Sequence, residues 1–151
     1  MVSGGLVQLA DKHDPLNDEV ATGATADQDG GQLAALVISV STGFDAQVIK
    51  ASAGRLYGYI GWNFDATKLA FVKFYNKATA PDPSADAALL LWTHYIHPGA
   101  ATASDQRSDC QYTFPHGLAF SNGIALVLTQ GAGVDETAVD AGDVVVQLTY
   151  K

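Results

Sequence analysis

The chain has 151 residues, a length typical of one domain, and hydrophobic residues make up 48% of it. Acidic residues outnumber basic residues by 16 to 8, which gives a formal net charge of −8. This charge argues against nucleic acid as a partner, because nucleic-acid binding needs a basic surface, and against an anionic membrane. The single cysteine, Cys110, cannot form an internal disulfide and suits a reducing cytoplasm.

The sequence predicts neither a secretory leader nor a membrane span. The segment Met1–Gly5 has no basic region, and no apolar leader-like run follows it. The longest apolar stretch, Leu33–Val40, is too short to cross a bilayer as a helix. We therefore expect the protein to be made in the cytoplasm of its cell.

The first 31 residues differ in composition from the rest of the chain. Six acidic residues, one lysine and no aromatic residue give this segment a formal charge of −5. Such a composition predicts an extended polar N-terminal arm, residues 1–31, rather than a packed core. Within the arm, only Leu6, Val7, Gln8 and Leu9 form a run that suits a short strand. We expect this run to contact a neighbouring subunit by adding to an exposed sheet edge.

Residues 32–151 predict a β-domain, because β-branched and aromatic residues cluster in short runs between turn-forming residues. Several runs alternate along the chain, so we expect one face of each strand to be buried. Helical periodicity is absent, although Ser84 could cap a short helix over Ala85–Leu91. The predicted strands are Leu33–Ser41, Ala46–Lys50, Arg55–Trp62, Leu69–Asn76, Leu89–His97, Gln111–Phe114, Ile124–Thr129 and Val144–Tyr150.

These eight strands predict a single all-β, antiparallel sandwich of the jelly-roll type. An immunoglobulin-like strand order stays open, since many such sandwiches lack the paired cysteines of antibody domains. Gly58 and Gly61 interrupt one strand and predict a bulge or the close approach of another backbone.

No motif in the sequence predicts an enzyme or a cofactor site. His94 and His97 are three residues apart, which places them on opposite faces of a strand and disfavours a shared metal ion. His13 and His116 are far from each other in the chain. Cys110 follows Asp109, and an acidic neighbour disfavours a reactive thiolate, so we expect a buried, inert thiol. Neither a nucleophile elbow nor a phosphate-binding loop is present in the sequence.

Two further groups of residues have both a functional and a structural interpretation. Acidic residues cluster in two places and could bind calcium, but we expect solvated loop side chains in both. The first cluster lacks the bidentate glutamate of a calcium loop. Three aromatic side chains could stack on sugars, but we expect them to pack in the core. The acidic groups are Asp27, Asp29 and Gly30, and Asp135, Glu136, Asp140 and Asp143; the aromatic residues are Trp62, Trp92 and Tyr95.

Four segments, taken in chain order, resemble a group of small structural proteins of tailed bacteriophages. They supply a Ser-Ala-Gly-Arg-Leu-Tyr strand, a Val-Lys-Phe-Tyr-Asn-Lys strand, a Pro-His-Gly-Leu-Ala-Phe-Ser-Asn-Gly-Ile turn and a terminal Tyr-Lys. The segments are Lys50–Ile60, Phe71–Lys77, Pro115–Ile124 and Val144–Lys151. The resemblance covers roughly residues 46–151 and does not include the arm.

The resemblance implies a β-sandwich of the head-decoration or cement type, which binds the major capsid protein on the outside of the virion. Such proteins are commonly homotrimers, and the matching residues form strands and turns rather than a chemical site. The resemblance therefore implies adhesion without catalysis and without a cofactor. A receptor- or glycan-binding module of a phage fibre or spike is the alternative, and it would need exposed tryptophan and tyrosine residues gathered at one end of the sandwich.

Overall fold

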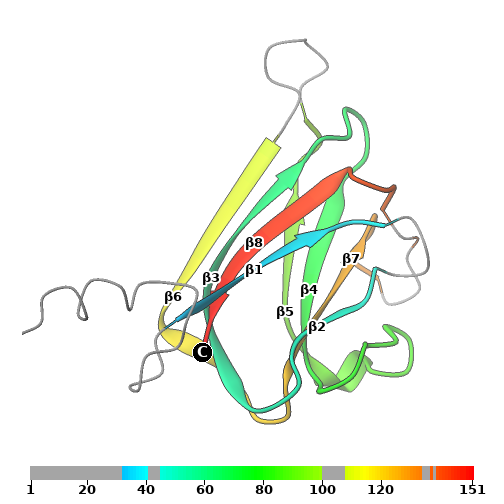
Figure 1. Ribbon diagram of the computed structural model, residues 1–151. Coiled ribbons are helices and arrows are strands. Elements are labelled where there is room, and N and C mark those ends of the chain that lie inside the picture. Colours follow the sequence, from blue (N-terminus) through cyan, green and yellow to red (C-terminus); the bar gives the residue numbers. More distant parts are fainter. Residues whose placement is uncertain (1–31, 41–44, 100–107, 134–136, 138) are drawn as a thin grey trace, which may run out of the picture. The chain divides into compact units, whose positions relative to one another are not determined.

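Eight strands and one short helical turn make up the part of the chain that the structure describes (Figure 1). The computed structural model describes residues 32–40, 45–99, 108–133, 137 and 139–151. In chain order the elements are β1 (Leu33–Ile38), β2 (Gln47–Lys50), β3 (Gly54–Asn63), β4 (Ala70–Asn76), η1 (Ala87–Leu89), β5 (Leu90–Ile96), β6 (Ser108–Phe120), β7 (Ile124–Thr129) and β8 (Val144–Tyr150).

The strands form two four-stranded antiparallel sheets, which confirms the predicted all-β sandwich. One sheet has the order β1-β8-β3-β6, and the other has the order β2-β7-β4-β5. This is the strand order of a jelly roll, in which strands distant in sequence become neighbours. The sequence left open whether the strand order was that of a jelly roll or of an immunoglobulin-like sandwich. The pairing of β3 with β8 and of β2 with β7 shows the jelly-roll order.

All eight predicted strands are present, and the bounds of β7 and β8 agree with the prediction to the residue. The largest difference is β6, which was predicted to span only Gln111–Phe114. Because β6 is an edge strand, Pro115 can lie within it without removing a hydrogen bond from the middle of the sheet. Gly117 has a φ of 70°, and near it the pairing of β6 with β3 shifts register. A residue that tolerates positive φ thus lets the strand bulge and continue.

Only a single 3-10 turn forms within the candidate helical stretch Ala85–Leu91. This turn, η1, is preceded by Asp86 rather than by Ser84. Ser84 lies in the preceding turn, where its hydroxyl donates a hydrogen bond to Asp82. A side chain engaged in a local turn of this kind competes with helix capping.

The hydrophobic core lies between the two sheets. In β8 the expected alternation is clear, because Val144, Val146 and Leu148 are buried while Gln147 is exposed. Side chains from both sheets fill the same layer, and the core includes Val37, Leu56, Tyr59, Val72, Phe74, Ile96, Phe120, Ile124, Leu126, Leu128, Val144, Val146 and Leu148.

The expectation that each strand buries only one face is wrong for β4 and β7. In β4, Lys73 and Tyr75 lie on the face opposite the core, yet they are as deeply buried as Phe74. The loop after β7 approaches this outer face, since Lys73 donates a 2.5 Å hydrogen bond to the carbonyl of Gly133. The segment that follows β7 therefore covers β4 at Lys73 on the outside of the sheet. Strand periodicity does not carry this information, because the covering residues are remote in sequence.

Several sequence expectations lie outside the described residues. They concern the polar arm, residues 1–31, with its candidate contact run Leu6, Val7, Gln8 and Leu9, and the acidic residues Asp27, Asp29, Asp135 and Glu136. Among the residues that are described, no helix has the length and apolar character needed to cross a bilayer.

Candidate functional site

Five aromatic rings gather where the edge strands β5 and β6 of the two sheets approach each other. We call them the aromatic cluster: Tyr59 on β3, Trp92 and His94 on β5, and Tyr112 and Phe114 on β6. The Trp92 ring centroid lies 4.6 Å from that of Tyr112 and 5.2 Å from that of Phe114. The cluster fills the space between the two edge strands on this side of the sandwich. Part of its surface is in contact with solvent, since Tyr112 is 38% exposed.

A chain of hydrogen bonds fixes three of these rings. The indole Nε1 of Trp92 donates to the hydroxyl oxygen of Tyr59 at 2.9 Å, and that oxygen lies 2.6 Å from Nδ1 of His94. Because Tyr59 already accepts from Trp92, donation of its own hydrogen to Nδ1 satisfies all three groups. This arrangement requires a neutral His94 ring, and burial lowers the His94 pKa in that direction.

The electrostatics of the aromatic cluster favour neutral groups. Burial raises the pKa of Tyr59 well above its ordinary value. Burial also raises the pKa of the neighbouring Cys110 thiol, and the Asp109 carboxylate raises it further. Neutral phenol, imidazole and thiol groups pack and donate hydrogen bonds but do not act as strong bases or nucleophiles at neutral pH. The arrangement is therefore suited to holding rings in place and to stacking.

Replacing Tyr59 with phenylalanine tests this hydrogen-bond chain. We expect the Tyr59→Phe change to lower the free energy of unfolding by about 1–3 kcal/mol, because the partly buried Trp92 and His94 nitrogens lose their shared partner. Tyr75→Phe is the matched control, since the buried Tyr75 hydroxyl has no hydrogen-bond partner in the described part of the chain. That control should leave stability unchanged or raise it in urea denaturation. Equal losses in the two variants would contradict the assigned role of Tyr59.

The other residues singled out from the sequence lie in different surroundings. Tyr95 is 49% exposed on the outer face of β5, so the expectation that it packs in the core is wrong. Its ring contacts that of His97, with centroids 4.9 Å apart. Trp62 is half-buried on β3, and Cys110 is half-buried rather than buried. A tyrosine on an edge strand can remain exposed because no further strand covers it.

A second surface feature is a row of apolar side chains on β1 and just after it. Leu36, Ile38 and Val40 alternate along the chain and are 62%, 47% and 50% exposed, respectively. We call these three residues the β1 stripe. Val37, which points the other way, is buried in the core, so the strand cannot turn to hide the stripe. Among the described strands, β1 is also one of the two edge strands of its sheet.

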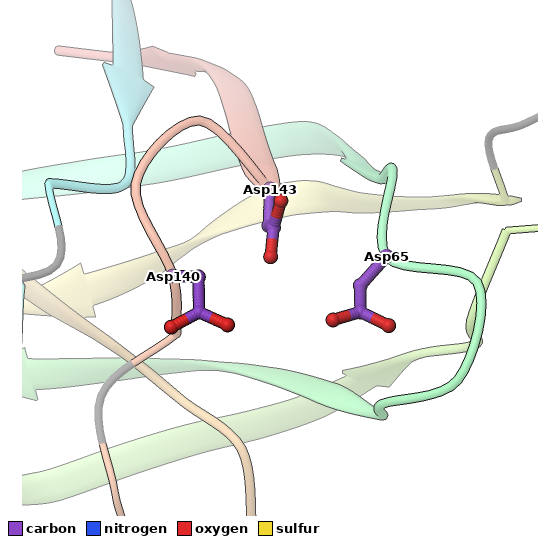
Figure 2. A group of neighbouring side chains, drawn as sticks. All are labelled: Asp65, Asp140 and Asp143. Atoms are coloured by element: carbon purple, nitrogen blue, oxygen red, sulfur yellow. The ribbon is translucent and has the colours of Figure 1, made fainter.

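Three carboxylates, those of Asp65, Asp140 and Asp143, converge at the end of the sandwich where β3 ends and β8 begins (Figure 2). Oxygen atoms from all three lie within 4.8 Å of one another, which is close enough to share a cation. The Lys68 ammonium lies 2.6 Å from Asp140 and 3.9 Å from Asp65 and supplies positive charge there. The sequence grouped Asp140 with Asp143, but it gave no signal for Asp65, which comes from the distant β3–β4 loop.

The three acidic residues differ in the direction of their pKa shifts. Backbone hydrogen bonds from Thr67 and Lys68 lower the pKa of Asp65. Burial raises the pKa of Asp143, and the negative charges of Asp65 and Asp140 raise it further. Because the pKa of Asp143 is higher in the folded than in the unfolded chain, stability falls as the pH rises above the ordinary aspartate pKa, and the loss is complete above the raised pKa.

We therefore expect Asp143→Asn to stabilise the fold at neutral pH, by less than about 1 kcal/mol because solvent screens the group. The gain should shrink as the pH falls and vanish below the ordinary aspartate pKa, where wild-type Asp143 is protonated in both folded and unfolded chains. Thermal unfolding from acidic to neutral pH measures this difference. A gain that is independent of pH would show that charge repulsion is not its cause.

Comparison with known protein families and with curated proteins found no match to this chain. The resemblance to phage structural proteins therefore rests on the sequence motifs alone. The fold and the surface features described above provide independent observations for a functional proposal.

Proposed function

We propose that this protein is a bacteriophage virion structural protein of the head-decoration or cement type. It binds the major capsid protein on the outside of the head, as a homotrimer, and stabilises the particle by adhesion. The observation that carries the proposal is the β1 stripe, an exposed apolar row beside an edge that no other described strand occupies. The ordered motifs between Lys50 and Lys151 supply the link to phage structural proteins.

The β1 stripe has the properties of an adhesive surface. Large apolar side chains that are exposed together favour association, because burial in a partner removes them from water. An edge strand also offers unpaired backbone donors and acceptors to a partner strand. Isolated in solution, such an edge is an aggregation hazard, so a protein that retains one is explained by a partner that covers it.

Attachment to purified capsids that lack this protein tests the proposal. Leu36→Thr and Ile38→Thr together should weaken attachment by about tenfold or more, since each buried aliphatic side chain contributes about 1.5–3 kcal/mol. Leu91→Thr is the matched control, because Leu91 is similarly exposed, at 41%, but lies on β5. It should change attachment by less than about twofold. Wild-type protein that fails to attach to any such capsid would refute the proposal.

A separate deletion variant tests whether the N-terminal arm contributes to capsid attachment. Deleting residues 1–31 should reduce attachment if Leu6, Val7, Gln8 and Leu9 add to a neighbouring sheet edge. Circular dichroism of the shortened protein reports whether the sandwich still folds. Unchanged attachment of a folded, shortened protein would remove the arm from the proposal and leave the β1 stripe as the contact.

The aromatic cluster favours a second candidate function, a receptor- or glycan-binding module of a phage fibre or spike. Tyr112 and Trp92 present partly exposed rings, which are suited to stacking on sugars. They lie along one side of the sandwich rather than at one end. In this function, Trp92→Ala should abolish binding on a glycan array and reduce adsorption to host cells. An array without binding, together with unchanged adsorption of Trp92→Ala and Trp62→Ala, would exclude it.

A further inference from the structure

A basic hollow lies at the opposite end of β3 from the three clustered carboxylates. It has a volume of about 440 Å³ and opens widely to solvent. Two lysines and an arginine line it, and no acidic residue does. In a chain with net charge −8, this concentration of positive charge stands out. The lining residues are Lys50, Ala53, Gly54, Arg55, Tyr57, Ala119, Phe120 and Lys151.

Backbone pairing brings the three basic residues together. The N–H of Arg55 donates to the carbonyl of Lys151 at 2.8 Å, and the N–H of Lys151 donates back to Arg55 at 2.9 Å. Gly54 permits this approach, because a Cβ there would lie 2.5 Å from the Lys151 carbonyl oxygen and 3.0 Å from Cδ of Lys50. The lysine stem therefore lies against the glycine, and the hollow is built by the sheet itself.

Arg55 is held in position by the bulge in β6. Its Nη1 donates to the carbonyls of His116 and Gly117, at 2.8 Å and 3.2 Å. Gly117 is required at this position, since its φ is 70° and a Cβ there would lie 3.0 Å from Cβ of Arg55 and 3.1 Å from Cε1 of Tyr57. The guanidinium is thus oriented by the backbone, and its remaining N–H donors make no hydrogen bond to the described residues. A pre-oriented guanidinium suits bidentate binding of a carboxylate.

Two of the basic residues that line the hollow, Lys50 and Arg55, have positive charges that are not paired within the described part of the chain. Among the described residues, no carboxylate lies within ion-pair distance of Lys50 or Arg55. By contrast, Lys68 pairs with Asp140, and Lys77 pairs with Asp86. The sandwich therefore has a basic hollow where β3 begins and an acidic cluster where β3 ends. A partner that meets the basic end is selected by negative charge.

We propose that the basic hollow binds an acidic polypeptide segment of a protein partner. The hollow is too open to enclose a small ligand, because sites for small molecules bury most of the ligand surface. A long polyanion such as nucleic acid would be repelled by the acidic remainder of the surface. A short segment with several carboxylates matches both the extent of the hollow and its charge. This inference rests on the proposed function, because that function supplies a protein partner and the inference specifies the chemistry of that partner.

A short fluorescein-labelled peptide of alternating aspartate and glutamate residues is the probe for this site. We expect saturable binding to the full-length wild-type protein by fluorescence anisotropy, weakening as salt increases. Arg55→Gln should weaken binding by about tenfold, the effect of losing charge-assisted hydrogen bonds. Lys50→Gln should weaken it in the same direction and does not disturb the Arg55 anchor. Lys68→Gln is the matched control, with the same change in net charge at the acidic end of the domain.

Each outcome decides for or against the proposal. Weakening by Arg55→Gln and Lys50→Gln, with less than about twofold change for Lys68→Gln, supports the hollow as the site. Equal weakening in all three variants, or no saturable binding by the wild type, overturns it. Inorganic phosphate that displaces the probe at the concentration of the peptide itself would show a site for single anions rather than for a segment, and also overturns it. Capsid attachment, measured separately with wild-type protein, tests the proposed function, so the two proposals can fail independently.

Discussion

Phe74→Ala is expected to lower the free energy of unfolding by about 3–5 kcal/mol, the typical cost of removing a buried aromatic ring. Phe74 is fully buried on β4, a central strand of its sheet. Its ring centroid lies 5.2 Å from that of Tyr59, and it pairs across the sheet with Trp92. The substitution therefore leaves a cavity in the core and also removes the support beneath the aromatic cluster.

Urea denaturation followed by tryptophan fluorescence measures this loss. Phe64→Ala is the control, because Phe64 is the same residue type but is 43% exposed. It should cost less than about 1 kcal/mol. If the two alanine variants were destabilised equally, the assignment of Phe74 to the centre of the core would be wrong.

The second large effect is expected at Gly123, which lies immediately before β7. A Cβ at this position would lie 2.7 Å from the carbonyl oxygen of Lys50 and 2.8 Å from backbone atoms of Lys77 and Ala78. Because all three obstacles are backbone atoms, no side-chain rotation relieves the clash. We expect Gly123→Ala to cost about 3 kcal/mol or more, at the upper end of overpacking effects.

Gly142 provides the control for Gly123→Ala. It has a φ of 81°, but a Cβ there would meet nothing within 4 Å. Gly142→Ala should therefore cost only the backbone strain of about 1–2 kcal/mol. Thermal unfolding of the two variants separates steric exclusion from backbone conformation. A Gly142→Ala variant less stable than Gly123→Ala would contradict this interpretation.

The strand positions were predictable because burial of one face imposes a period of two on the sequence. Val144, Val146 and Leu148 in β8 illustrate this, and β8 has the predicted bounds. The limits of β6 were not predictable, since Pro115 and Gly117 normally end a strand. β6 continues through Pro115 because it is an edge strand, and through Gly117 because it bulges there. Neither property can be inferred until the neighbouring strands are placed.

The surface features were also predictable only in part from the sequence. The alternation of Leu36, Ile38 and Val40 is present in the sequence, but their exposure depends on β1 lying at a sheet edge. The basic hollow gave no sequence signal, because Lys50 and Arg55 are about one hundred residues from Lys151. The same is true of Asp65, which meets Asp140 and Asp143 only because β3 and β8 are neighbours.

The sequence by itself determined the all-β class and the location of the strands, since both follow from local composition and alternation. The resemblance to phage structural proteins also came from the sequence, and it stays a prediction. Only the tertiary structure decided the jelly-roll order, the burial of both faces of β4 and β7, and the groups of residues that form each surface. The physical reason is that these features depend on contacts between strands far apart in the chain, which the local pattern of residues does not encode.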